Sequence, residues 1–291
     1  MNRRAFLATA CASAAPRRQI RIDTHTHLYD PTRPQGVPWP SPKDSGLYRP
    51  VLPQLFRQAV AGLGDVRTVV VEASPWVEDN QWLLDLARDE PVIAGIVGNL
   101  QAGDPDFRSN VRRFARNPLF RGIRVYPQNA LKRLPLDRLI DELRILPEAG
   151  LQVDLNGGAG LFADALQIAS KVPQLRIVIE HLPYAWPEDP AKQDAARRAF
   201  RELAAMPHVY AKVTQFLDAG SAFRQSAVDE VWDAFAPGRV FYGSNWPLSD
   251  RVSSYRSQME RISSYVAGHG PDAADQFFFQ NAVAAYKLQI R

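Results

Sequence analysis

The sequence contains almost no cysteine and no long apolar or basic run. Cys11 is the only cysteine among 291 residues, which excludes a disulfide bond within the chain. No segment reaches the roughly 18 consecutive apolar residues that a membrane-spanning helix needs, so we expect no integral membrane segment. Basic residues follow one another at most in pairs. A nucleic acid is therefore a poor candidate for the partner, and we expect a small-molecule substrate.

The first fifteen residues have the layout of an export signal. Arg3 and Arg4 precede a short apolar stretch and a run of small residues that ends at Ala14. Paired arginines in this position resemble a twin-arginine signal, which predicts export, to the periplasm. Cleavage after Ala14 would lower the net charge from +4 to +2 and remove Cys11. The alternatives are a cytoplasmic protein with incidental arginines and lipidation of Cys11.

Short β-branched runs recur in residues 16–291, and longer amphipathic stretches follow them. Eight such alternations predict a parallel sheet, because each crossover between parallel strands needs a helix. We therefore expect a single-domain (β/α)8 TIM barrel with its active site at the C-terminal ends of the strands. The alternative is an open doubly wound sheet. The predicted strands are Ile20–Thr24, Thr68–Glu72, Val92–Val97, Gly122–Tyr126, Leu151–Leu155, Arg176–Glu180, Val209–Val213 and Val240–Gly243. The helical patterns include Asp79–Arg88, Asp106–Arg116, Leu136–Glu148, Leu161–Ser170 and Ala191–Ala205.

One long irregular insertion, Tyr29–Pro53, follows the first predicted strand. It is rich in proline and carries Trp39 near its centre. A long loop at this position of a barrel lies on the catalytic face, and such loops often bind substrate. We expect Trp39 to contact substrate; the alternative is a rigid packing loop.

The first strand ends in Asp23-Thr24-His25-Thr26-His27. Because side chains two apart in a strand share a face, Asp23, His25 and His27 are predicted to point into the barrel, with the histidines at its mouth. Two neutral imidazoles side by side can hold a metal ion. The alternative is a pair of histidines hydrogen-bonded within the rim.

A third histidine, His181, follows the sixth predicted strand. At the rim it could polarise a carbonyl or transfer a proton, which predicts a catalytic role; a structural histidine is the alternative. His208 precedes a strand and His269 lies near a helix end. Both are expected to be structural.

Charged and polar side chains also end the fourth, fifth and seventh strands. Arg124 and Tyr126 share a face of the fourth, and a guanidinium there could bind a carboxylate or a ring carbonyl. Asn156 and Lys212 are further candidates for substrate binding. Asp154 is a candidate catalytic carboxylate, although Asp154 and Lys212 could equally form an ion pair inside the barrel.

The motifs DTHTH, GIR, DLN, EHLP, AKV and GSNWP, in this order, resemble the amidohydrolase-related family of TIM-barrel hydrolases. Within it, the sugar-lactonase and dicarboxylic-lactonase branch is most similar, over nearly the whole chain after the signal. The resemblance implies water attack on the ring carbonyl of a lactone. It also implies one divalent metal ion, zinc above all, or a metal-independent reaction. The GSNWP motif places Asn245 and Trp246 at the site, as a catalytic and a substrate-binding residue.

The sequence departs from this family at two positions. Members usually have aspartate where Asn245 stands, and an amide has no usable basicity. Metal-dependent members often have histidine where Asn156 stands, so we expect weakened metal binding at His25 and His27.

Three functions remain compatible with these departures. The first is a lactone hydrolase whose base has moved to Asp154, Glu180 or Glu72. The second is a decarboxylase or other lyase on the same barrel, and the third is a barrel that binds a ligand without catalysis. A carboxylate close to the histidine pair would favour the first function. An aromatic, carboxylate-poor pocket would favour the second.

Overall fold

The structure is a computed structural model, and it describes residues 20–182 and 186–290. The proposed signal, Met1–Ala15, lies outside the described residues. Within the part that is described, none of the helices has both the length and the apolar character needed to cross a membrane.

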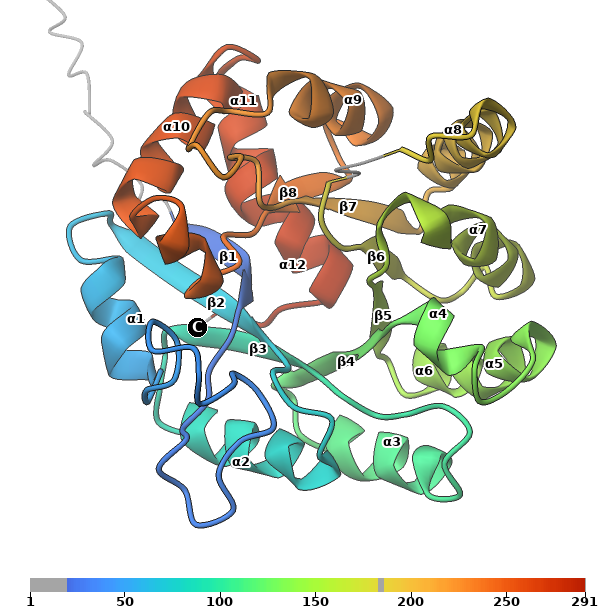
Figure 1. The fold of residues 1–291 in the computed structure, drawn as a ribbon, viewed down its shortest axis with the longest axis horizontal. Coiled ribbons are helices and arrows are strands. Elements are labelled where there is room, and N and C mark those ends of the chain that lie inside the picture. Colours follow the sequence, from blue (N-terminus) through green and yellow to red (C-terminus); the bar gives the residue numbers. More distant parts are fainter. Residues whose placement is uncertain (1–19, 183–185, 291) are drawn as a thin grey trace, which may run out of the picture.

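Eight parallel strands form one sheet in which the strand order follows the sequence (Figure 1). Each predicted strand overlaps an observed one, with ends that shift by three residues at most. The strands are β1 (Ile20–Thr26), β2 (Asp65–Val71), β3 (Ile93–Gly98), β4 (Phe120–Val125), β5 (Gln152–Leu155), β6 (Ile177–Ile179), β7 (Val209–Val213) and β8 (Val240–Tyr242).

Hydrogen bonds between β1 and the end of β8 close the sheet into a barrel. The hydroxyl of Thr24 donates to the carbonyl oxygen of Tyr242 at 2.7 Å. Beyond it, the Asn245 N–H donates to the His25 carbonyl and the His27 N–H to the Trp246 carbonyl, both at 2.8 Å. The predicted (β/α)8 barrel is confirmed, and the open sheet is wrong.

Helices surround the barrel, as its parallel strands require (Figure 1). They are α1 (Pro53–Ala59), α2 (Val77–Ala87), α3 (Phe107–Ala115), α4 (Pro127–Ala130), α5 (Leu136–Leu143), α6 (Ile145–Glu148), α7 (Phe162–Lys171), α8 (Pro190–Ala205), α9 (Gln225–Phe235), α10 (Tyr255–Ala267), α11 (Pro271–Asp275) and α12 (Asn281–Tyr286). The stretch Leu136–Glu148, expected as one helix, is divided at Arg144 into α5 and α6. Pro147 cannot donate a backbone hydrogen bond to the preceding turn, which weakens the helix there.

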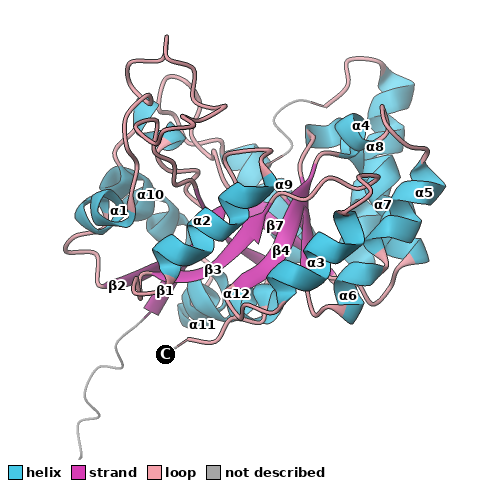
Figure 2. Ribbon diagram, turned by 90° about the horizontal axis from the view of Figure 1, so that it is seen from below, coloured by secondary structure: helices cyan, strands magenta, loops and turns pink. Residues whose placement is uncertain are grey.

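The last helix, α12, closes the end of the barrel opposite the long loops (Figure 2). Its residues Ala282, Ala285 and Tyr286 pack with strand side chains such as Ile22 and Val69 in a core inside the barrel. A larger core lies between the strands and the outer helices. One end of the barrel is therefore filled, and any substrate must enter from the other, where the C-terminal ends of the strands and their loops lie.

Candidate active site

A bulge in β1 sets the direction of the side chains at its end. The pairing of β1 with β2 changes register between Asp23 and Thr26. Asp23 accepts hydrogen bonds from the backbone of Ser244 at 2.8 Å and from the hydroxyl of Tyr255, on the outer helix α10, at 3.1 Å. The prediction that Asp23 points into the barrel is wrong, because the bulge interrupts the alternation of side chains. Asp23 instead fastens β1 to the β8 loop and to α10.

His25 and His27 lie side by side at the mouth, with ring centroids 5.0 Å apart. His25 is fully buried, and neither of its ring nitrogens has a hydrogen-bond partner. Its Cβ packs tightly against Gly243, where an added Cβ would lie 2.9 Å from the Cβ of His25. Glycine at this position therefore lets β8 approach β1 closely enough to close the barrel.

His27 is oriented by backbone carbonyls and faces Asn245. Its Nδ1 lies 3.0 Å from the carbonyl oxygen of Val71 and 3.1 Å from that of Glu72, so Nδ1 carries the proton and donates. Its Nε2 then presents a lone pair to the side chain of Asn245, 3.3 Å from Oδ1. An amide turned by 180° would donate its N–H to this lone pair.

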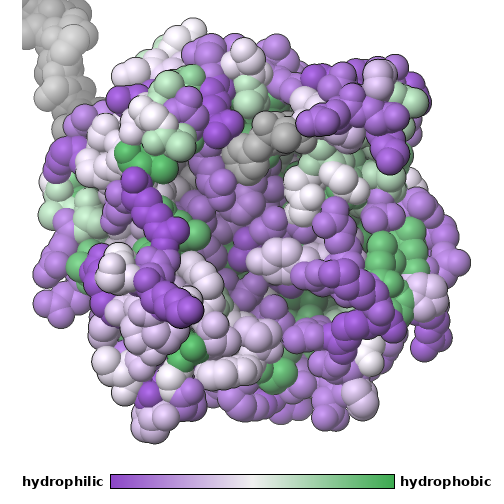
Figure 3. Space-filling model, viewed as in Figure 1, coloured by the Kyte–Doolittle hydropathy of each residue, from purple (hydrophilic) through white to green (hydrophobic). Residues whose placement is uncertain are grey.

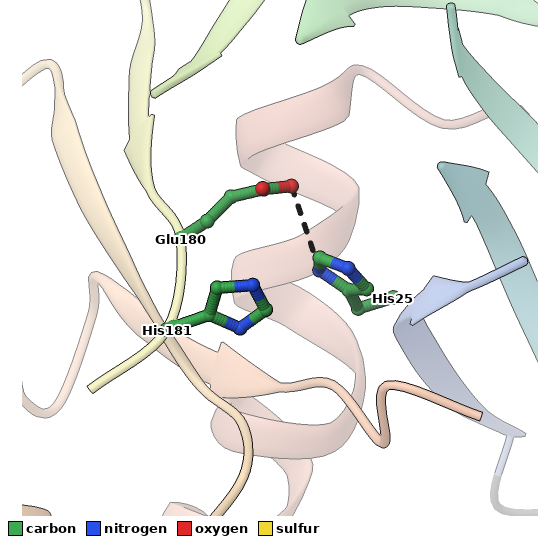
Figure 4. Close-up of side chains that lie close together, drawn as sticks. All are labelled: His25, Glu180 and His181. Atoms are coloured by element: carbon green, nitrogen blue, oxygen red, sulfur yellow. Dashed lines mark ion pairs between the residues drawn. The ribbon is translucent and has the colours of Figure 1, made fainter. Parts of the chain in front are cut away.

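Glu180 and His181, which follow β6, complete the group around His25 (Figure 4). Glu180 Oε1 lies 3.4 Å from His25 Nδ1, and the His181 and His25 ring centroids are 4.8 Å apart. His181 Nδ1 lies 2.6 Å from the hydroxyl oxygen of Thr214. Ligand atoms of His25, Glu180 and His181 all lie within 4.8 Å of one another, close enough to surround one metal ion. His27, expected to share the metal with His25, is not part of this group.

The mouth keeps its histidines neutral. Burial and the nearby Arg124 guanidinium lower the pKa of His27 to about 4. Burial also lowers the pKa of His181 to about 3; Glu180 acts in the opposite direction, and the positive charges of Arg124 and Lys212 offset that effect. Burial and then Lys212 hold the pKa of His25 well below its usual value. Neutral imidazoles are the form that binds a metal ion or accepts a proton.

A chain of alternating charges runs up the inside of the barrel. Lys212 Nζ lies 2.5 Å from Asp154 Oδ2 and 3.2 Å from Glu180 Oε1. Arg124 Nε donates to Glu180 Oε2 at 2.6 Å, and its Nη1 lies 3.6 Å from Glu72 Oε1. Burial alone would raise the pKa of the Glu180 carboxyl, but Arg124 and Lys212 together hold it well below its usual range.

Asp154 and Lys212 lie below the mouth and have no access to solvent. Asp154 also accepts a hydrogen bond from the hydroxyl of Tyr286 on α12, at 3.0 Å. Burial, partly offset by Lys212, raises the pKa of Asp154 to about 6. The internal ion pair predicted as one alternative is confirmed. The structure does not bring either residue to the mouth, where the catalytic role of Asp154 and the substrate contact of Lys212 would require them.

A cavity of about 300 Å³ opens between the ends of β2, β3 and β4. None of the three histidines of the mouth lines it, but its lining residue Glu72 contacts His27 Nδ1 through its backbone carbonyl. Arg124 and Tyr126 line it, as expected for substrate-binding residues, and the guanidinium carbon lies 4.9 Å from the Tyr126 ring centroid. Burial raises the pKa of the Tyr126 phenol, and the nearby Arg124 and Asn156 side chains offset part of this rise. The space-filling view shows a hollow near the centre of this face, with mainly hydrophilic residues around it (Figure 3). Glu72 also lines this cavity.

The two tryptophans expected at the site differ in position. Trp39, in the Tyr29–Pro53 insertion, is partly exposed, and its ring centroid lies 5.9 Å from that of His27. Trp246 is 1% exposed and packs against Phe56 of α1. The expected substrate contact of Trp246 is wrong, because its ring is part of the core between the barrel and the helices.

Most of the remaining predicted positions are where the sequence indicated. His208 bonds to the backbone of Ala169, and His269 stacks on Trp232, both away from the mouth. Glu180 is the residue that sequence reasoning undervalued, since it was considered only as a base and the structure makes it a candidate ligand. Its place two residues after the inward-facing Val178 was the available signal.

The comparisons with known proteins agree with this geometry. Residues 22–288 match the family model described as Amidohydrolase. The chain belongs to the amidohydrolase family. It is 32% identical to an L-fucono-1,5-lactonase from Burkholderia ambifaria, over 92% of this chain and 96% of that protein. An L-fucono-1,5-lactonase from Burkholderia multivorans is 26% identical, over 81% and 85% of the two chains. A crystal structure of an amidohydrolase from Burkholderia multivorans with bound zinc has a TM-score of 0.80 at 24% identity, covering 93% of this chain and all of that one (100%). 

The buried charge chain predicts a large effect of removing Lys212. Lys212→Met leaves Asp154 and Glu180 buried with one cation fewer, which should lower the free energy of unfolding by about 3–5 kcal/mol. Denaturant titration at neutral pH measures this change. Adding Asp154→Asn should recover part of the loss, because it removes a buried carboxylate left without a cation. As a control, Arg113→Met breaks the exposed pair with Glu78 and should cost less than about 1 kcal/mol. A Lys212→Met protein as stable as this control would contradict the interpretation.

Proposed function

We propose that this amidohydrolase opens a lactone, either a sugar lactone or a related carboxylic lactone, by water attack on the ring carbonyl. The observation that carries the proposal is the position of Arg124. Its guanidinium is held between Glu180, which also contacts His25, and Glu72, and Arg124 lines the cavity. The two lactonase relatives support the same reaction.

The geometry assigns a role to each side chain at the mouth. A lactone in the cavity can place its carbonyl oxygen against Arg124, whose fixed positive charge stabilises the negative charge that develops there during attack. Neutral His181, held at Nδ1 by Thr214, can offer its other ring nitrogen to the lactone ring as a hydrogen-bonding partner. Asn245 can orient the attacking water through its amide but cannot accept a proton. Trp39 covers the site from the side of His27.

The cavity favours hydrolysis over the two alternatives. A decarboxylase acting on aromatic acids would be expected to have an aromatic pocket poor in carboxylates. Among the described residues that line this cavity, Tyr126 is the only aromatic one, and Glu72 contributes a carboxylate. A binding barrel without catalysis has no need of a carboxylate close to the histidine pair, yet Glu180 lies 3.4 Å from His25.

The proposed function predicts turnover of lactones that depends on the shape of Arg124. Purified protein should accelerate the opening of L-fucono-1,5-lactone or related sugar 1,5-lactones above the spontaneous rate, followed by proton release with an indicator dye. Arg124→Lys keeps the charge between Glu180 and Glu72 but loses the planar fork, and kcat should fall by roughly 10²-fold. The surface variant Arg113→Met should match the wild type. Failure of the wild type on sugar, muconate-type and pyrone lactones alike would refute the proposed function.

We further propose that His25, Glu180 and His181 can hold one divalent metal ion, with zinc as the best fit to two imidazoles and a carboxylate. The ring nitrogens of His25, neither of which makes a hydrogen bond, fit this role. Such an ion would polarise a carbonyl and favour ionisation of bound water. Affinity should be modest, because Arg124 and Lys212 already neutralise Glu180.

This metal site is testable without an activity assay. Calorimetric titration of the metal-free protein with zinc should show one weak site that His25→Asn abolishes and His269→Asn preserves. Asn245→Asp adds a negative charge beside His27 and should tighten binding. Zinc that remains stoichiometric after dialysis against a chelator would show that the affinity is not modest. No binding at high zinc would exclude the site.

We also propose that Met1–Ala15 directs export in the folded state, to the periplasm. The paired Arg3 and Arg4 before a short apolar stretch support this. Replacing both arginines by lysine should trap a precursor in the cytoplasm, as detected by fractionation and mass spectrometry of the N-terminus. Wild-type protein recovered from the cytoplasm with these residues intact would contradict the proposal.

A further inference from the structure

We propose that Glu72 is the general base of this enzyme and takes the role that the Asn245 amide cannot perform. The inference rests on the proposed lactone hydrolysis and names the residue that activates water. It follows from comparing the carboxylates that the described part of the barrel directs toward its interior: Asp154, Glu180 and Glu72. Asp23 is not among them, since it faces Ser244 and Tyr255.

Asp154 and Glu180 are both occupied. Asp154 is fully buried and is held by Lys212 and by Tyr286, on the closed side of the barrel. Glu180 is also without solvent access, and each of its oxygens lies against a cation, Oε2 against Arg124 and Oε1 against Lys212. A carboxylate stabilised in this way by two cations is a poor proton acceptor.

Glu72 differs in both position and charge balance. It follows β2 directly, lines the cavity together with Arg124, and retains 7% exposure. Its nearest cation is Arg124 at 3.6 Å, a longer contact than the 2.6 Å bond between Arg124 and Glu180. The chain of charges contains three carboxylates and two cations, so one negative charge has no matching cation. Glu72 ends this chain on the side of the cavity.

The surroundings of Glu72 also favour proton uptake. Burial raises the pKa of its carboxyl, and Glu180 adds to this, while Arg124 and the Asn99 side chain offset part of the effect. Its backbone carbonyl accepts a hydrogen bond from His27 Nδ1, which fixes the end of β2 to the histidine pair. The carboxylate is therefore anchored beside the guanidinium that would bind the lactone carbonyl.

The proton balance of the reaction can be completed by this one group. A water molecule between Glu72 and the lactone gives a proton to the carboxylate while its oxygen bonds to the carbonyl carbon. The carbonyl oxygen takes the negative charge beside Arg124. When the bond between the carbonyl carbon and the ring oxygen breaks, protonated Glu72 returns the proton to that oxygen. The product is a hydroxy acid, which ionises and releases one proton to solvent.

The experiment compares Glu72→Gln and Glu72→Ala with wild type on the best lactone. Glu72→Gln removes the basicity and keeps the shape, so kcat should fall by roughly 10²–10⁴-fold with little change in KM. Formate should restore part of the activity of Glu72→Ala, because it can occupy the vacated space and accept the proton. Glu78→Gln, on the surface of α2, is the matched control and should match wild type. Circular dichroism and thermal unfolding confirm that each variant is folded.

A carboxylate introduced at position 245 tests whether Glu72 acts as a base or has only a structural role. Asn245→Asp should raise the activity of Glu72→Gln, since it places a carboxylate at the mouth beside His27. Three results would overturn the assignment: Glu72→Gln within a few-fold of wild type, an effect confined to KM, or no rescue by either formate or Asn245→Asp. A wild type that opens no lactone refutes the proposed function itself, and this outcome is distinct from an active wild type whose Glu72 variants are unimpaired.

Discussion

The buried ammonium of Lys212 between Asp154 and Glu180 is the interaction on which the active site depends. Ions removed from water are costly unless partners of opposite charge surround them. Lys212 satisfies two carboxylates at once, at 2.5 and 3.2 Å. Lys212 fixes Glu180 through its Oε1, and the other oxygen of Glu180 accepts a hydrogen bond from Arg124. Arg124 in turn lines the cavity. The position of the guanidinium that lines the cavity is thus set by a lysine that has no access to solvent.

The closure of the barrel gives a second constraint at the mouth. The same two backbone hydrogen bonds that join β1 to the loop after β8 also set His27 opposite Asn245. Both Asn245 and His181 have positive φ, 62° and 66°, a backbone conformation that asparagine and histidine adopt more readily than most residues. The hydrogen bonds that close the sheet therefore also orient the side chains of the mouth, which lie at the strand ends.

The fold was predictable from the sequence because each strand is short, apolar and followed by a helical pattern. The convergence of His25, His27, His181 and Arg124 follows from that fold, since each residue ends a strand. The direction of Asp23 was not predictable, because a bulge changes side-chain alternation without any clear mark in the sequence. Trp246 follows a polar motif and has the appearance of a site residue, but tertiary packing with Phe56 decides its position. The division of three carboxylates between two cations depends on distances across the barrel, which no local pattern contains.

The neutral amide of Asn245 and the carboxylate of Glu72 together determine where negative charge lies at the mouth. An aspartate beside His27 would place a negative charge next to its Nε2 and favour the imidazolium form or a bound cation. With Asn245 there instead, burial and Arg124 keep His27 neutral. The negative charge not matched by a cation lies at Glu72, which follows β2 and lines the cavity together with Arg124. Substrate would then meet the guanidinium and the carboxylate on the β2–β4 side and neutral donors and acceptors on the other. In such a site the strongest proton acceptor and the strongest anion-stabilising group are neighbours, so proton removal from water and stabilisation of the carbonyl oxygen can occur at the same wall of the cavity.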